Sequence, residues 1–314
     1  MNSEQIKNLF MCLFSRTARK KYRKARRENF KLIMTLVVKN EEDILETNIR
    51  FHHAMGVDGF IVSSHNSTDR TNDILERLQK EGLVLAIIHR TGVEHKHAIW
   101  VDEMIRLAKK FGAEWVINAD ADEFYYSNHL DLKKSILESE GANVLWVDSI
   151  FLFPEDREDY LNSTFFESRR LKIFEAEALG IQDDPVFSSL TAFPACPKVI
   201  HKTSGYKKIS DGNHDVRMHF RVKCHSADIR LYHYHIRNYT GWEKKIRNWE
   251  KSIFLLPDGQ GEHMKNMVRI YQEGRLREEF EKMYGPEVRD FLIAQGVVSI
   301  DPSVPNFLRY KGLV

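Results

Sequence analysis

The sequence predicts an α/β protein built on a doubly wound, mostly parallel sheet, and two observations predict it. Between residues 31 and 150, short apolar runs alternate with stretches of helical periodicity, which is typical of βαβ units. The apolar runs are rich in Val, Ile, Leu and aromatic residues, as strands buried on both faces require. The expected strands are Leu32–Val38, Gly59–Ser63, Leu83–Ile88, Trp115–Asn118 and Val144–Val147.

The stretches between these runs predict helices on both faces of the sheet, each with one apolar side. Asp43 and Thr71 precede the first two stretches and are suitable N-cap residues. The third stretch repeats apolar residues at steps of four, three and four. These residues are Trp100, Met104, Leu107 and Phe111. We interpret that stripe as core.

The rest of the chain suggests three parts: residues 1–29, 30–240 and 241–314. The first is a basic segment, with eight Lys and Arg residues and no acidic residue between Arg16 and Arg27. The second is the α/β domain, which contains an irregular, Phe-rich region from Ser149 to about Lys198. The third is a helical C-terminal extension, in which Trp242, Ile246 and Trp249 share one face.

Composition favours a folded protein, because 42% of residues are hydrophobic and 29% are charged. Three scattered cysteines argue against a disulfide framework and indicate a reducing, cytoplasmic setting. The basic segment follows a short apolar run, Leu9–Phe14, so it is either a solvated tail or a peripheral tether at the inner face of a membrane. No aromatic interleaving accompanies it, and nucleic-acid binding is not expected.

Acidic side chains follow directly on one predicted strand. Asp120, Asp122 and Glu123 come after the apolar run Trp115–Asn118. Open α/β sheets bind ligands at the carboxyl ends of their strands. If the chain is still extended there, Asp120 and Asp122 point the same way and offer oxygen ligands to Mg²⁺ or Mn²⁺. A solvated acidic turn explains this triplet equally well when it is taken alone.

Polar loops also follow the first two predicted strands. They are Lys39–Glu42 and Asn66–Thr71. Capping and turn preferences explain part of this polarity. They do not explain why three strand ends that should meet in one crevice are all polar, so a binding site is expected there.

These motifs, in this order, resemble those of the family 2-like glycosyltransferases with the GT-A fold. The resemblance rests on Val38–Glu41, Asn66–Thr71 and the Asp-Ala-Asp-Glu-Phe motif at Asp120–Phe124, and is closest to a bacterial branch. It extends through Pro197–Ile200, Gly212–His214 and His233–Asn238. In this branch a Ser is usual where Asn238 stands. The resemblance spans about residues 31–250.

The resemblance implies a nucleotide diphosphate-sugar donor, a UDP-sugar in the first instance, with Mn²⁺ or Mg²⁺ as cofactor. Lys39, Asn40 and Glu41 would lie near the base, and Asp69 near the uracil or ribose. Asp120 would lie near the ribose and the metal. Asp122 would bind the metal itself.

Two later groups of residues complete the expected donor site. His233 and His235 alternate with Tyr232 and Tyr234, so on a strand both imidazoles would face one side. Family likeness favours His233 as a metal ligand, and hydrogen-bonded packing is the alternative. Arg237 and Lys245 suit diphosphate contacts, although solvated positive charge would explain them too.

If the reaction inverts the anomeric centre, a base must accept the proton of the attacking hydroxyl. Asp215 and His214 are the first candidates, in the polar turn Asp211–Asp215. Glu155 and Asp156 are alternatives, and a plain turn explains the motif without catalysis. The acceptor groove would form from the Phe-rich region between Phe151 and Phe193.

The resulting hypothesis is sugar transfer to a glycan or lipid-linked acceptor, in the synthesis of a bacterial surface polysaccharide or lipopolysaccharide. Two alternatives remain at this point. A metal-dependent phosphohydrolase or nucleotidyltransferase would use the same aspartates, but it would be expected to show more carboxylate and His ligands. A non-catalytic donor-binding protein would keep the fold and lack the base.

Overall fold

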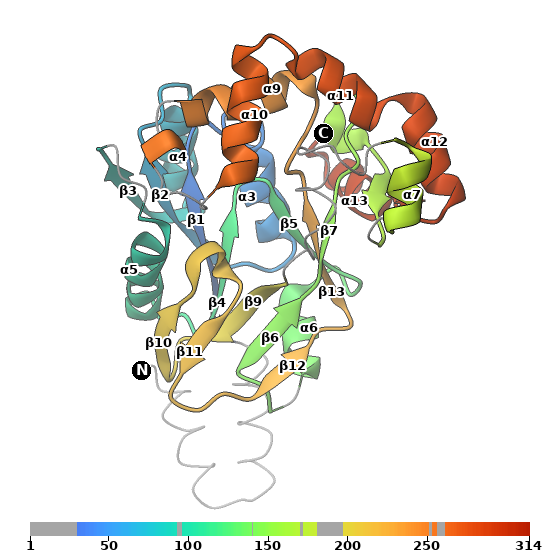
Figure 1. Ribbon diagram of the computed structural model, residues 1–314. Coiled ribbons are helices and arrows are strands. Elements are labelled where there is room, and N and C mark those ends of the chain that lie inside the picture. The colour runs from blue at the N-terminus through green and yellow to red at the C-terminus, as the bar shows by residue number, and fades with distance from the viewer. Residues whose placement is uncertain are drawn as a thin grey trace, which may run out of the picture.

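The computed structural model describes residues 30–92, 96–139, 141–169, 172–180, 197–250, 253–255 and 261–314. Its centre is a seven-stranded sheet in the order β12-β6-β9-β4-β1-β2-β3 (Figure 1). The strands are β1 (Leu32–Val38), β2 (Gly59–His65), β3 (Val84–Arg90), β4 (Trp115–Asp120), β6 (Val144–Val147), β9 (Lys198–Lys202) and β12 (Lys223–His225). Strands β3, β2, β1 and β4 are parallel, and β9 runs antiparallel to β4 and β6. The mostly parallel sheet is confirmed.

Strand β1 shows why this sheet is buried on both faces. Leu32, Met34 and Leu36 belong to the apolar cluster on one face, whereas Ile33 belongs to the cluster on the other. Side chains of a strand alternate between its two faces, so an uninterrupted apolar run supplies both clusters.

Helices cover both faces, as the sequence predicts. Helices α3 (Leu45–Ala54) and α4 (Thr71–Lys80) supply Ile49 and Leu75 to the first cluster. Helix α5 (His97–Lys110) covers the opposite face together with the hairpin of β10 (Tyr206–Ile209) and β11 (Val216–Met218). The expected stripe on α5 is buried at Trp100 and Met104, whereas Phe111 lies past the end of the helix and is 38% exposed.

The two expected N-caps are wrong. The residue that precedes α3 is Ile44, and Asp43 instead accepts a hydrogen bond from Tyr160 at 3.2 Å. Thr71 is the first residue of α4, and Asp69 accepts hydrogen bonds from its backbone N at 3.0 Å and its hydroxyl at 2.6 Å. Asp43 thus has a tertiary partner in place of a cap, whereas Asp69, two residues before Thr71, provides a local hydrogen bond to the start of α4.

A second, three-stranded sheet brings the C-terminal histidines to the acidic motif. It has the order β5-β13-β7, with β5 (Glu123–Ser127), β13 (Ile229–His233) and β7 (Ser149–Phe151). His233 is paired with Glu123 on one side and with Phe151 on the other. Helix α6 (Leu132–Glu138) follows β5. The register of this small sheet therefore fixes His233 next to the turn that contains Asp122.

The chain beyond Gly241 is mainly helical, as expected, with Trp242 and Ile246 buried on α9. The helices are α9 (Tyr239–Glu250), α10 (Glu262–Gln272), α11 (Leu276–Tyr284), α12 (Pro286–Ala294) and α13 (Ser303–Tyr310). Short elements complete the fold: α7 (Ile173–Ala178), β8 (Phe165–Glu167), β14 (Val298–Ile300) and the 3-10 turns Tyr160–Asn162, Asp211–Asn213 and Ile253–Leu255. β14 pairs with β8, and Phe307 of α13 packs into the first cluster, so the C-terminal residues close the main core.

Within the part of the chain that the structure describes, none of the helices has the length and apolar character needed to cross a bilayer. The apolar run at residues 9–14, the basic segment at residues 16–27, and Cys12 and Cys196 lie outside the described residues. Cys224 is an exposed free thiol.

Candidate functional site

The acidic motif lies in a tight connection between the two sheets. Asp120 is the last residue of β4, Glu123 is the first of β5, and Ala121 and Asp122 form a turn between them. The chain is therefore not extended through this motif, contrary to the assumption made from the spacing. The backbone N of Asp120 donates to Glu123 Oε2 at 3.1 Å, which holds the turn closed.

Asp122 forms the centre of a buried charged cluster. Its Oδ1 lies 3.4 Å from His233 Nε2, and its Oδ2 lies 3.1 Å from Lys245 Nζ. Lys245 belongs to α9, and its ammonium also donates to the carbonyl of His235 at 3.1 Å. Burial by itself raises the pKa of Asp122, but the charges of Lys245 and His233 outweigh burial and hold this pKa well below its usual value. Asp122 is therefore an anion aimed at His233.

Asp120 belongs to an adjoining cluster that sequence reasoning did not anticipate. Lys198 of β9 is buried, with Nζ 2.8 Å from Glu123 Oε1 and 3.8 Å from Asp120 Oδ2. His97 Nε2 lies 3.6 Å from Asp120 Oδ1. Burial opposes ionisation of Asp120, yet Lys198 and His97 lower the pKa of Asp120 below its usual value. Lys198 stands in a segment that carries the family resemblance, but His97 has no signal in the sequence.

Arg237 is held by two carboxylates of the loop after β1. It forms ion pairs with Asp43, at 2.5 Å, and with Glu41. Burial lowers the pKa of Arg237, but Glu41 and Asp43 together raise it well above its usual value. Burial raises the pKa of Glu41 despite its pairing with Arg237. The structure thus brings Glu41 and Arg237 together, with the guanidinium already engaged by protein carboxylates.

The loops after β1 and β2 are tied to each other. Asn40 Oδ1 accepts from the backbone N of Thr68 at 2.7 Å, and Asp69 Oδ2 accepts from the backbone N of Glu42 at 3.3 Å. Asn40 has a φ of 57°, a left-handed conformation that Asn tolerates better than most residues. Lys39 lies in the same loop and is half-buried.

Helix α9 connects these loops to the acidic cluster. Asn248 Oδ1 accepts from Asn40 Nδ2 at 3.3 Å, and Lys244 Nζ lies 3.4 Å from Asp69 Oδ2. One residue further along the helix, Lys245 reaches Asp122. Side chains from three strand ends thus meet beneath one helix, as Figure 1 shows for α9 above β1 and β2.

The two candidate bases differ in their surroundings. Both carboxylate oxygens of Asp215 pair with Arg221, at 2.6 and 3.1 Å, and Lys223 lies at 3.5 Å. His214 Nδ1 donates to the carbonyl of Pro197 at 3.2 Å, and its ring lies over Gly212, where a Cβ would come within 2.7 Å of His214 Nε2. Asp215 is therefore engaged by Arg221, whereas His214 is held by the backbone of Pro197.

The turn that carries His214 lies near Asp120, because His97 lies 3.6 Å from Asp120 and 3.8 Å from Asp211 of that turn. Burial, followed by the charge of Lys198, lowers the pKa of His214, while Asp120 acts in the opposite direction. The other candidates, Glu155 and Asp156, pair with Arg289 at 3.5 Å and Arg277 at 2.5 Å respectively. These two arginines belong to α12 and α11, so the structure does not bring Glu155 and Asp156 into the cluster.

The expected aromatic acceptor groove is only partly described. Phe153 and Phe166 are buried in apolar clusters, whereas Phe174 is 59% exposed. Phe187 and Phe193 lie outside the described residues. Two of the proposed groove residues are therefore core.

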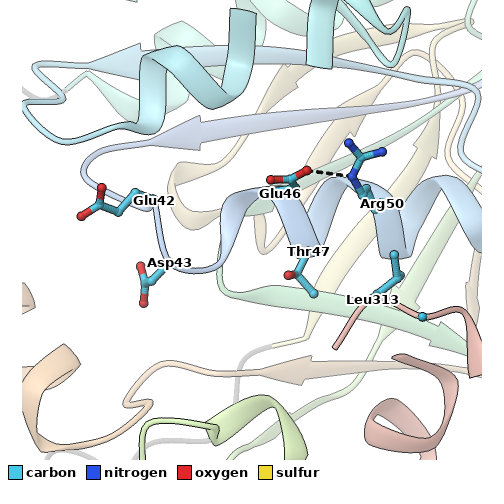
Figure 2. Close-up of a pocket in the computed structure, with 7 residues that line it drawn as sticks. Glu42, Asp43, Glu46, Thr47, Arg50 and Leu313 are labelled. Carbon is cyan, nitrogen blue, oxygen red and sulfur yellow. Dashed lines mark hydrogen bonds and ion pairs between the residues drawn. The ribbon is translucent and has the colours of Figure 1, made fainter. Parts of the chain in front are cut away.

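A cavity of about 380 Å³ lies on the outer side of α3 and is lined by Glu42, Asp43, Glu46, Thr47, Arg50, Gly312 and Leu313. Figure 2 shows Glu42 and Asp43 at the start of this helix, with Leu313 of the C-terminal segment below it. Glu46 pairs with Arg50 at 2.9 Å. Three carboxylates against one arginine make this cavity unfavourable for a diphosphate.

The side chains at Asp122 fit a divalent cation that completes its shell with substrate. Among the described residues, no group of three or more His, Cys, Asp or Glu side chains is arranged to hold a metal ion. Asp122 Oδ1 and His233 Nε2, 3.4 Å apart, offer two ligands on one side. His235 Nδ1 is buried nearby and has no hydrogen-bond partner within the described part of the chain. Mg²⁺ and Mn²⁺ sites often use one or two protein ligands together with substrate phosphates and water.

Several solved structures are similar to this chain at low identity. TarS 1-349 of S. aureus in complex with UDP-GlcNAc is 12% identical, with a TM-score of 0.41, over 85% of this chain and 82% of that chain. The mannosyltransferase PcManGT of Pyrobaculum calidifontis, with GDP-Man and Mn²⁺, is 13% identical, with a TM-score of 0.41, over 91% and 81%. Glucosyl-3-phosphoglycerate synthase of Mycobacterium tuberculosis is 17% identical, with a TM-score of 0.31, over 57% and 59%.

No curated protein sequence matches this chain. Its residues 34–280 match glycosyltransferase family 92. The sequence resemblance named family 2-like enzymes, whereas the matching family is family 92. The expected glycosyltransferase class is therefore confirmed, while the family 2-like resemblance, the GT-A fold and the bacterial branch stay predictions. The matched range is well over half of the chain and includes the loop after β1, Asp122, His233 and Lys245. The chain therefore belongs to glycosyltransferase family 92.

Proposed function

We propose that this glycosyltransferase transfers a sugar from a nucleotide diphosphate-sugar, a UDP-sugar in the first instance, with the assistance of Mn²⁺ or Mg²⁺. The observation that carries the proposal is the pairing of Asp122 with His233 at the carboxyl end of the parallel sheet, 3.4 Å apart. Asp122 is ionised, and it lies where open α/β sheets bind their ligands.

The nucleoside would bind against the loops after β1 and β2. Asn40, Glu41 and Asp69 line this position, and the hydrogen bonds between the two loops fix their backbones before any ligand enters. A preformed pocket loses less entropy on binding than one that must be ordered. The family resemblance implies that Lys39 lies near the nucleobase, and we propose the same role here.

The diphosphate would lie beside Asp122, where cationic side chains converge. Lys245 Nζ and the buried Lys198 Nζ already face carboxylates of the motif, so positive charge is in place without further rearrangement. Asp120, Asp122 and His233 would hold the cation. When bound, such a cation offsets the charge that builds up on the departing diphosphate. Arg237 would contribute to donor binding indirectly, because it holds the carboxylate of Glu41 in position.

His214 is the proposed base for an inverting transfer, in preference to Asp215. Its Nδ1–H donates to Pro197, so the neutral ring carries its lone pair on Nε2. The lowered pKa keeps the imidazole neutral near pH 7, as an acceptor of the hydroxyl proton must be. The carboxylate of Asp215 is already paired with the guanidinium of Arg221.

The acceptor is proposed to be a glycan or a lipid-linked glycan, in the synthesis of a bacterial surface polysaccharide or lipopolysaccharide. Phe174 is exposed and would contact a sugar ring through the side of its ring that Lys172 does not cover. The remainder of the Phe-rich region that would complete this groove lies outside the described residues.

The test is a turnover assay with a panel of UDP- and GDP-sugars and short oligosaccharide acceptors, with and without Mn²⁺. We expect release of nucleoside diphosphate to depend on one donor and on the metal. In Asp122→Asn, kcat should fall by about 10²–10³, a typical loss when one group that stabilises transition-state charge is removed.

Asp159→Asn is the matched control, because Asp159 is an exposed carboxylate that, like Asp122, pairs with a cationic side chain, here Arg157 at 2.5 Å. Its turnover should equal that of the wild type. Full activity of Asp122→Asn, or equal turnover without any divalent metal, would contradict the proposed site.

A further inference from the structure

The end of the central sheet opposite the donor cluster exposes large apolar side chains. In the connection between β11 and β12, Phe220 is 86% exposed and Val222 is 54% exposed. Figure 1 shows this connection at the lower edge of the molecule, far from α9 and α10. A single exposed apolar residue is ordinary, so the surroundings of Phe220 decide whether it has a role.

The backbone that carries Phe220 is fixed by one side chain. Asn143 Nδ2 donates to the carbonyl of Phe220 at 2.6 Å, and the backbone N of Val222 donates to Asn143 Oδ1 at 2.8 Å. The backbone N of Asn143 in turn donates to the carbonyl of Val222 at 3.0 Å. Three hydrogen bonds to one residue thus hold Phe220 and Val222 outward, and neither side chain reaches a core cluster.

The hairpin that precedes this apolar pair in the chain carries exposed basic side chains. Lys207, Lys208 and Arg217 are exposed on the adjoining β10–β11 hairpin. In its register, Lys208 lies directly opposite Arg217. Like charges in directly opposed positions destabilise a strand pair. The fold tolerates this repulsion on an open surface, and an anionic partner would relieve it.

The first described residues of the chain lie at the same edge. The backbone N of Glu114 donates to the carbonyl of Lys31, and the backbone N of Thr203 donates to the carbonyl of Glu114, both at 2.9 Å. Lys202, next to Thr203, donates from its backbone N to the carbonyl of Asn143 at 2.9 Å. This series of bonds runs along one edge of the sheet, from the start of β1 to the residue that holds Phe220.

We propose that this edge, defined by Lys207, Lys208, Arg217, Phe220 and Val222 and named the basal rim, docks on the surface of an anionic lipid bilayer. Phe220 and Val222 would enter the boundary between headgroups and acyl chains. The cations of the rim would lie at the level of the anionic headgroups. Apolar insertion combined with basic attraction is the usual basis of peripheral membrane binding.

A nucleic acid is the less favoured partner for the same charges. Its phosphates would pair with Lys208 and Arg217, but the aliphatic side chain of Val222 offers a base no stacking surface. Both apolar residues of the rim, in contrast, suit an acyl boundary.

Docking by the basal rim orients the donor site. Asp122 follows the carboxyl end of β4, whereas Phe220 and Val222 are bonded to Asn143, directly before the amino end of β6. These two ends of the central sheet are roughly 20 Å apart, since its longest strands have seven residues. The donor site would then open away from the bilayer, toward a soluble acceptor or the outer part of a long lipid-linked glycan. The docking itself does not depend on which sugar is transferred.

The test is co-sedimentation of the full chain with vesicles of phosphatidylcholine alone or mixed with phosphatidylglycerol. The rim variants are Phe220→Ser, alone and with Val222→Ser, and Lys208→Glu with Arg217→Glu, which keeps a like-charge pair in the hairpin. The matched controls are Phe254→Ser, at another exposed phenylalanine, and Lys80→Glu, at an exposed lysine of α4. Thermal melting and nucleotide-sugar binding verify that each variant is folded.

We expect the wild type and both controls to bind the anionic vesicles and to be released by high salt. Each rim variant should bind at least about fivefold more weakly, which is the effect of roughly one basic residue near an anionic surface. Rim variants that bind as tightly as the wild type would overturn the proposal, because residues 1–29 would then account for all the affinity. Binding to a single-stranded oligonucleotide, with none to vesicles, would also overturn it.

Discussion

Asp122 Oδ1 lies 3.4 Å from His233 Nε2, which joins a residue of the β4–β5 turn to one that is 111 positions later in the chain. The contact exists because His233 is paired with Glu123 in the small sheet, directly after the turn. The alternation of residues 232–235 turns Tyr232 and Tyr234 into the core and leaves both imidazoles on the opposite side, as predicted from the sequence.

His214→Gln tests the proposed base. Gln can still donate to Pro197 but cannot accept a proton, so we expect kcat to fall about a hundredfold or more. In the wild type, activity should decline as the pH falls through the pKa of His214, because the protonated ring no longer accepts the proton of the acceptor. Since that pKa is lowered, the decline should begin below about pH 6.5.

A pH series of kcat for His214→Gln and for Asp215→Asn distinguishes the two candidates. His214→Gln should lose most of its activity, and its kcat should no longer decline at acidic pH. Asp215→Asn should keep its activity and the same decline. The opposite pattern would assign the base to Asp215.

Arg237→Met tests whether Arg237 holds the loop after β1. It would leave Glu41 and Asp43 close together without their shared cation, so we expect the free energy of unfolding to fall by about 3 kcal/mol. Urea unfolding measures this loss. The double variant Arg237→Met with Glu41→Gln should recover part of it because one unpaired charge is removed. A single variant as stable as the wild type would show that Arg237 is not structurally required.

His52 predicts a dependence of stability on pH. Its Nε2 accepts from the backbone N of Tyr125 at 2.9 Å, and burial lowers its pKa to about 3. Between about pH 6.5 and pH 3 the unfolded chain therefore binds a proton at this residue that the folded chain does not. Stability should fall with decreasing pH over this window, by about 2 kcal/mol at pH 5.

Urea unfolding of the wild type and of His52→Gln at pH 7 and pH 5 measures this effect. The variant should lose about 2 kcal/mol less on acidification than the wild type does. His201, whose pKa burial lowers to about 4, provides part of the remaining pH dependence. If His52→Gln and the wild type lose the same free energy of unfolding between pH 7 and pH 5, His52 is not a source of the pH dependence.

Local sequence patterns were sufficient for much of the fold. The bounds of β1 and β6 agree with the expected runs to the residue, because a short apolar run between polar turns fixes both ends of a buried strand. β9 and the second sheet depend on pairing between distant segments. No periodicity within one segment reports such pairing, and these elements were not predicted.

The site was predictable where a motif lies at a strand end, as with Asp120 and Asp122. It was not predictable where a partner comes from far along the chain. Lys198 reaches Glu123 across 75 positions, and His97 reaches Asp120 from the start of α5. Asp43 was misassigned for the same reason, since its partner Arg237 is 194 positions away.

The most direct test of a metal-dependent donor site is a calorimetric titration of UDP into the wild type and Asp122→Asn, each with and without Mn²⁺. We predict that Mn²⁺ tightens the binding of UDP to the wild type by tenfold or more, on the order of 1.4 kcal/mol, and has no such effect on Asp122→Asn. Equal tightening in both proteins would contradict this prediction.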